Sequence, residues 1–119
     1  MNRKPAEKFQ DLIVWQKAHA LVLQVYAITK GFPKEELFGL TSQMRRSAVS
    51  VPANIAEGFK RRSKADKARV LNIAEGSLEE LRYFFILATD LGYAPRGSYE
   101  ADAEEVARML SAYIRTISE

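Results

Sequence analysis

Hydrophobic residues recur at helical spacing in four segments of the chain. We predict helices over about 11–30, 41–60, 64–91 and 98–118, because apolar side chains return every three or four positions within each segment. No segment alternates apolar and polar residues for long enough to predict a strand. The short connections predict a single domain, residues 1–119, folded as an all-α, antiparallel up-down-up-down four-helix bundle.

The ends of these segments carry residues that start or stop helices. Side-chain oxygens that can accept from free backbone amides of a first turn are expected at Asp11, Thr41 or Ser42, Ser63 and Ser98. Gly92 follows the third segment and suits the left-handed position after a helix end.

The second predicted helix contains a proline. Pro52 cannot donate a hydrogen bond to the carbonyl of Ala48, and its ring crowds that turn. The apolar stripe nevertheless keeps its phase from Leu40 to Phe59. We therefore predict one helix, bent near Pro52, rather than two helices.

The first three helices carry a second apolar flank, which in the first helix includes Val14 and Leu21. A monomeric bundle of this size does not easily bury so much apolar surface, so the pattern predicts a homo-oligomer. The residues predicted to form the oligomer interface are Val49, Pro52, Ala56, Ile73, Phe84, Leu87 and Leu91. The alternative is a broad core within one chain and scattered exposed aliphatic side chains.

The net charge of +3 is unevenly distributed. Residues 41–70 carry eight Lys and Arg against two acidic residues, a balance of +6, whereas residues 71–119 carry four against nine, a balance of −5. Such asymmetry indicates polyanion binding or complementarity between subunits, and a solvated basic turn is the remaining alternative. The candidates for binding nucleic-acid phosphates are Arg45, Arg46, Lys60, Arg61, Arg62, Lys64, Lys67 and Arg69. Only Phe59 lies near this cluster in the sequence, so base stacking and base-specific readout are not expected.

No pattern predicts an enzyme, a metal site or a cofactor. The chain has one histidine, His19, and no cysteine. We expect His19 to be a packed structural residue beside Trp15. Adjacent acidic pairs such as Glu79 and Glu80 point about 100° apart on a helix, so they do not converge as acid and base. The polar N-terminus and the lack of a long apolar run predict a cytoplasmic protein that does not bind membranes.

Three stretches resemble a known family. They are Phe9–Leu21 (FQDLIVWQKAHAL), Phe32–Ser63, which contains GLTSQMRRSAVSVPANIAEG, and Ile73–Tyr93, which contains IAEGSLEEL and ATDLGY. These stretches are similar to the four-helix bundle family encoded in ribosomal RNA intervening sequences. The resemblance implies an up-down bundle that assembles into a homopentameric ring. It also implies a kinship with accessory proteins of diversity-generating retroelements, which bind reverse transcriptase and nucleic acid through a basic ring surface. The basic residues inside the matching stretches are Arg45, Arg46, Arg61 and Arg62.

The sequence thus predicts a non-enzymatic oligomeric bundle protein whose basic surface binds RNA or DNA. The alternative is a protein-interaction scaffold. In that case the basic segment contacts a neighbouring subunit or a protein partner, such as a reverse transcriptase, instead of nucleic acid.

Overall fold

The computed structural model describes residues 5–118. The first four residues of the polar N-terminus therefore lie outside the described range. Within this range the chain forms four α-helices, two short 3-10 helices and no strand. The elements are η1 (Phe9–Asp11), α1 (Ile13–Thr29), η2 (Lys34–Glu36), α2 (Leu40–Lys60), α3 (Lys64–Asp90) and α4 (Ser98–Ser118). The predicted helix boundaries differ from these by at most two residues, and the all-α four-helix prediction is confirmed.

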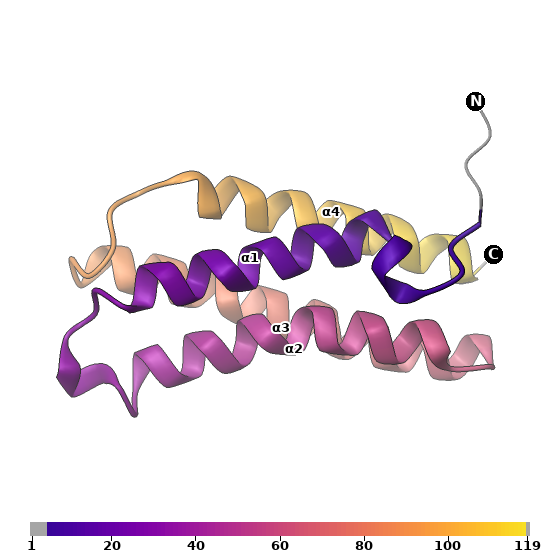
Figure 1. Ribbon diagram of the computed structural model, residues 1–119, viewed down its shortest axis with the longest axis horizontal. Coiled ribbons are helices and arrows are strands. Elements are labelled where there is room, and N and C mark those ends of the chain that lie inside the picture. The colour runs from indigo at the N-terminus through magenta and orange to yellow at the C-terminus, as the bar shows by residue number, and fades with distance from the viewer. Residues whose placement is uncertain (1–4, 119) are drawn as a thin grey trace.

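The four helices lie lengthwise beside one another, and the loops that join them lie at the two ends of the molecule (Figure 1). α1 packs against α2 and α4, and α3 packs against the same two helices. Among the described residues, the backbone of α1 does not approach that of α3, and the backbone of α2 does not approach that of α4. The four helices therefore surround one shared core, as in a bundle.

The core side chains come from the predicted apolar positions, except that the buried face of α1 is rotated relative to the predicted one. In α2 the stripe from Leu40 to Ile55 is buried, and the helix runs without interruption through Pro52, which is also buried. Its bend stays a prediction. In α1 the buried face includes Val14 and Leu21, which the sequence assigned to a second flank, whereas Tyr26 is 39% exposed. Part of the second apolar flank of α1 is therefore buried in the core of the chain itself.

Two of the predicted helix caps are wrong. The Asp11 carboxylate accepts from the backbone amides of Glu7 and Lys8 at 3.0 and 3.2 Å, because η1 inserts an extra turn before α1. Residues 41 and 42 lie inside α2, which has Gly39 at its N-cap. The free amide of Leu40 instead donates to the Glu36 carboxylate at 3.2 Å.

Other predicted ends are confirmed. The Ser63 hydroxyl accepts from the amide of Asp66 at 3.1 Å and caps α3. Gly92 has a φ of 78°, and the amides of Gly92 and Tyr93 donate to carbonyls in the last turn of α3. The side chain of Ser98, the predicted cap of α4, lies outside what the structure describes.

Glu36 ties the η2 turn to the end of α3. Its second carboxylate oxygen accepts from the Tyr93 hydroxyl at 2.9 Å, and this hydrogen bond raises the pKa of Tyr93 above its usual value of 10.0. The same turn carries Phe38, whose side chain is 93% exposed. Phe38 is therefore held outward on a turn that is fixed by hydrogen bonds.

A glycine allows α2 and α3 to pack closely near the turn that joins them. Gly58 is buried, and a Cβ added there would lie 3.0 Å from Cδ2 and 3.1 Å from Cγ of Leu71. By contrast, a Cβ added at the exposed Gly76 of α3 would meet nothing within 4 Å.

These two glycines give a matched pair of substitutions. Gly76→Ala should raise the free energy of unfolding by up to about 1 kcal/mol, because alanine favours a helix interior more than glycine does. Gly58→Ala should lower it by roughly 1–3 kcal/mol, because the added methyl overpacks the contact with Leu71. Urea unfolding at one fixed protein concentration measures both effects, and equal changes of the same sign would contradict the close packing.

Candidate nucleic-acid interface

The α2–α3 turn brings most of the predicted basic residues to one end of the molecule. α2 ends at Lys60 and α3 begins at Lys64. Figure 1 shows this turn at the end that also holds η1 and the last turns of α4. The turn is held by the Ser63 cap on one side and by the contact of Gly58 with α3 on the other.

Lys67 is part of the structure of this turn. Its ammonium donates to the carbonyls of Phe59 and Gly58 at 2.8 and 3.2 Å, and it lies 5.7 Å from the centre of the Phe59 ring. These carbonyls belong to the last turn of α2, where backbone acceptors lack helical partners and a cation is favoured. The ammonium of Lys67 is therefore bound to the C-terminal end of α2.

Arg45 is also engaged within the chain, far from the turn. Its Nε donates to the Thr29 hydroxyl at 2.9 Å, and its guanidinium lies 4.7 Å from the centre of the Tyr26 ring. These contacts join α2 to the last turns of α1.

Arg61 and Arg69 form exposed ion pairs on single helices. Arg61 pairs with Glu57 one turn earlier, and Arg69 lies 3.8 Å from the carboxylate of Asp66. Exposed pairs of this kind contribute about 0–1 kcal/mol, so both cations can exchange their partner for a phosphate.

Three of the predicted basic residues have no polar or ring partner in the part of the chain that the structure describes. They are Arg46, Lys60 and Arg62, and all three are exposed. Lys60, Arg61 and Arg62 border an open hollow of about 430 Å³ together with the two acidic partners named above. Lys64 is exposed and has a contact within the chain.

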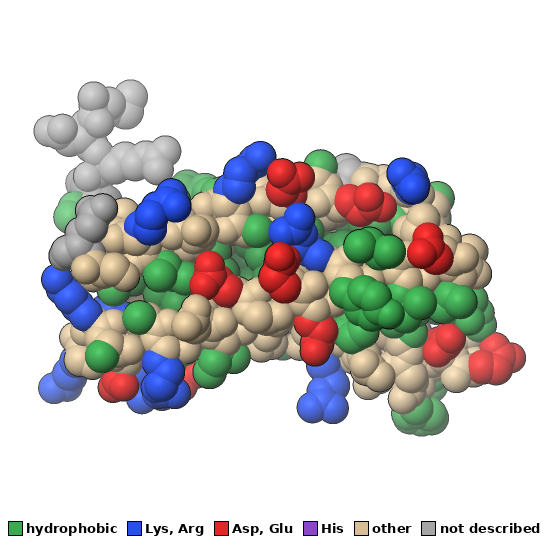
Figure 2. Space-filling model, turned by 180° about the vertical axis from the view of Figure 1, so that it is seen from behind, with side chains coloured by type: hydrophobic (Ala, Val, Ile, Leu, Met, Phe, Trp, Pro, Cys, Tyr) green, Lys and Arg blue, Asp and Glu red, His purple; other side chains and the backbone are tan. Residues whose placement is uncertain are grey.

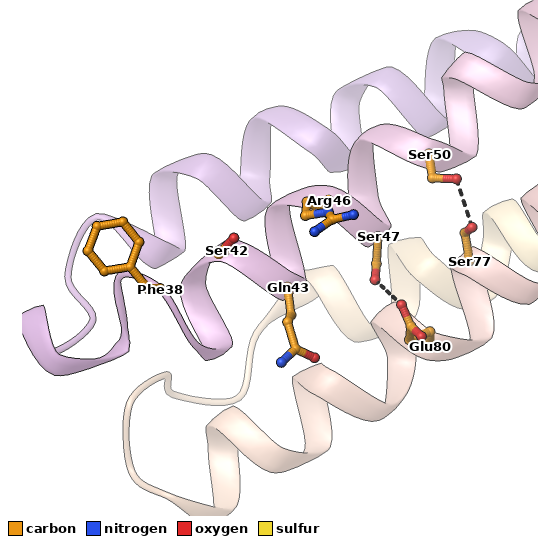
Figure 3. Close-up of a pocket in the computed structure, with 8 residues that line it drawn as sticks. All are labelled: Phe38, Ser42, Gln43, Arg46, Ser47, Ser50, Ser77 and Glu80. Carbon is orange, nitrogen blue, oxygen red and sulfur yellow. Dashed lines mark hydrogen bonds between the residues drawn. The ribbon is translucent and has the colours of Figure 1, made fainter.

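Arg46 lies in a different place. It precedes Lys60 by 14 residues of the same helix, a distance of about 20 Å along the axis. It lines an open groove of about 540 Å³ between α2 and α3, shown in Figure 3. The other residues of this groove are Phe38, Ser42, Gln43, Ser47, Ser50, Ser77 and Glu80.

Two hydrogen bonds join α2 to α3 along this groove. The hydroxyls of Ser50 and Ser77 lie 2.8 Å apart, and the Ser47 hydroxyl donates to the Glu80 carboxylate at 2.5 Å (Figure 3). This groove is lined by one cation, Arg46, and one carboxylate, Glu80, whereas three cations border the hollow at the α2–α3 turn. Of the two basic locations, the α2–α3 turn is therefore better suited to a polyanion.

The residues predicted to form an oligomer interface are only partly exposed. Val49, Ile73 and Leu91 are exposed, whereas Ala56 and Leu87 are half-buried. Pro52 and Phe84 are buried in the chain itself, the latter at 8% exposure.

Sequence analysis missed several larger exposed apolar side chains. The most exposed are Phe38, Leu23, Ile86 and Tyr83. Figure 2 shows hydrophobic side chains gathered at the end of the molecule opposite to the basic turn. The signal for Phe38 was an apolar pair, Leu37 and Phe38, inside a connector where polar residues are usual.

The structure offers few groups for other chemistry. Among residues 5–118, no group of three or more His, Cys, Asp or Glu side chains could hold a metal ion. No described helix is long and apolar enough to cross a membrane. His19 is exposed, and its ring is stacked on that of Trp15.

Comparison with known proteins gives the family of the chain. The model of the 23S rRNA-intervening sequence protein family matches residues 10–112. The chain belongs to this family. The fold also resembles a crystal structure from Bacteroides thetaiotaomicron, described as a protein of unknown function from the S23 ribosomal protein family. That chain is 28% identical, with a TM-score of 0.79, and the match covers 87% of this chain and 96% of the other. Comparison with curated proteins found no match.

The different roles of the basic residues can be tested by stability. Lys67→Met keeps the length of the side chain but removes its two hydrogen bonds, so the free energy of unfolding should fall by about 1.5–3 kcal/mol. Arg62→Met is the matched control at an exposed position and should change it by less than about 0.5 kcal/mol. Urea unfolding of both variants decides the matter. Equal stability of the two proteins would show that Lys67 does not hold the turn.

Proposed function

We propose that this member of the family is a non-enzymatic homopentamer that binds RNA or DNA phosphates through the α2–α3 turn. The observation that carries the proposal is the pair Lys60 and Arg62, two exposed cations without a partner in the described chain. They lie beside Arg61 in a segment with a balance of +6. The cytoplasmic location stays a prediction from the sequence.

The proposed subunit is an antiparallel up-down-up-down bundle with α2 bent near Pro52. Contacts between α1 and α4 support the antiparallel order. Lys17 lies 3.5 Å from Glu105, and Gln24 donates to Asp102 at 2.8 Å. Residue numbers thus rise along α1 while they fall along α4.

Two separate apolar surfaces support a ring. A ring forms when one surface of each subunit contacts a different surface of the next, whereas a two-fold dimer uses the same surface twice. Exposed apolar residues lie in the loop after η2 and along α3 to its end, whereas Val49 is exposed on α2. The residues of the first surface are Phe38, Ile73 and Leu91. The number of five subunits rests on the resemblance to the family.

A ring would place several copies of the basic turn on one particle, which increases the number of possible phosphate contacts. Each phosphate neutralised by Lys or Arg releases counterions, so affinity grows with the number of contacts and falls as salt rises. Such contacts fix position but carry no sequence information. We therefore expect weak sequence selectivity.

The second candidate is a protein-interaction scaffold. It is favoured by the balance of −5 in residues 71–119, which could meet the basic turn of a neighbouring subunit. The resemblance also suggests a reverse transcriptase as a partner for the turn. In either case the basic residues would stabilise a protein contact.

One double variant separates the two candidates. Arg61→Glu with Arg62→Glu reverses two charges in the turn. We expect the wild type to bind fluorescent RNA and DNA of arbitrary sequence, with affinity falling about 10³-fold or more between 50 and 200 mM salt if several phosphates are contacted. We expect the double variant to keep the wild-type mass by light scattering and to lose binding. Dissociation of the variant would favour the scaffold, and a wild type that binds nothing at low salt would refute nucleic-acid binding.

A further inference from the structure

Three aromatic rings meet at the start of α1, where two of them are stacked and the third packs edge-on. The rings of Trp15 and His19 are 5.1 Å apart and nearly parallel, with 7° between their planes. Phe9 of η1 meets Trp15 edge-on at 5.1 Å and 63°. Trp15 and Phe9 are half-buried, whereas His19 is exposed. Because Trp15 covers one face of the imidazole, the exposed surface of His19 lies on its other face and its edges.

This stack faces the side of the bundle that carries α2. Trp15, His19 and Tyr26 are spaced four and seven residues apart, so they share one face of α1. The Tyr26 ring receives the guanidinium of Arg45 from α2 at 4.7 Å. The shared face of α1 is therefore turned toward α2.

The stack also lies close to the level of the basic turn along the long axis of the bundle. The hydrogen bond from Arg45 to Thr29 fixes α2 against α1. From there, Trp15 is 14 residues back along α1 and Lys60 is 15 residues forward along α2, so both lie about 21–23 Å away at 1.5 Å per residue. Figure 1 shows that the start of α1 and the end of α2 lie at the same end of the molecule, and η1 packs against α2.

We propose that this aromatic stack and the basic turn form one site for single-stranded nucleic acid. An unpaired base stacks on the exposed side of His19, and the adjoining phosphates contact Lys60 and Arg62. The inference rests on the proposed function and adds to it a preference for unpaired strands. It also replaces the expectation, based on the sequence alone, that only Phe59 lies near the basic residues.

The chemistry of the stack suits any base. Every base has an aromatic face, so stacking on a protein ring tolerates different sequences, and phosphate contacts do so as well. Bases in a duplex are already stacked on their neighbours and cannot offer a face to His19 without being flipped out. The site should therefore distinguish single strands from duplexes of the same length.

Substitution of His19 tests the site. His19→Ala removes the exposed ring, and Tyr83→Ala removes an exposed ring of α3 as a matched control. The probes are oligouridylate, oligodeoxythymidylate, an abasic strand of the same length and a DNA duplex, at one fixed salt concentration. We expect His19→Ala to weaken binding of an RNA or DNA single strand by about fivefold or more. Duplex and abasic binding should not change, and Tyr83→Ala should bind as the wild type does.

A second substitution separates stacking from charge. His19→Tyr keeps an aromatic ring but cannot become a cation, so it should restore single-strand binding. If His19→Ala weakens binding of only oligouridylate or only oligodeoxythymidylate, the result supports the site and identifies its ligand as RNA or DNA. If it weakens binding of neither strand, the result overturns the site. Equal binding of abasic and normal strands also overturns it. If the wild type binds no nucleic acid at all, the proposed function fails as well. If the wild type binds with a salt-dependent affinity and His19→Ala binds single strands equally well, only the stacking site fails.

Discussion

The close approach of α2 and α3 at Gly58 shapes the end of the molecule that carries the basic turn. With no side chain at residue 58, Leu71 packs directly on the backbone of α2. The two helices can then be joined by only three residues. This proximity places the ammonium of Lys67 over the last carbonyls of α2, where it acts as a helix cap.

The same geometry divides the basic segment into two groups. Lys67 and Arg45 hold helices together through hydrogen bonds and aromatic contacts. Lys60 and Arg62 point to solvent and have no partner in the described chain. Some basic residues of this segment thus stabilise the fold, whereas others are exposed. Only the exposed ones are suited to contact phosphates.

Helix positions could be predicted because they depend on local patterns. Apolar spacing sets the four helices, and Ser63 and Gly92 mark ends through contacts within a few residues. Asp11 failed as a cap because it bonds the turn before it. The start of α2 was missed because its amide pairs with Glu36 of the preceding turn.

The site was less predictable because it depends on contacts distant in sequence. Nothing in the sequence shows that Lys67 reaches the carbonyl of Phe59 while Lys60 has no partner. The aromatic stack was missed for the same reason, since Trp15 is far from Lys60 in the sequence, and the packing of α1 on α2 brings the start of α1 and the end of α2 to the same end of the molecule.

The division of the basic turn is tested most directly by the salt dependence of single-strand binding. The comparison uses wild type, Lys67→Met and the double variant Lys60→Met with Arg62→Met. Each phosphate contact to a single strand contributes about 0.7 to the slope of log affinity against log salt. The double variant should therefore lose about 1.4 or more of this slope, while Lys67→Met keeps the slope of the wild type. A slope that falls with Lys67→Met and not with the double variant would contradict the account.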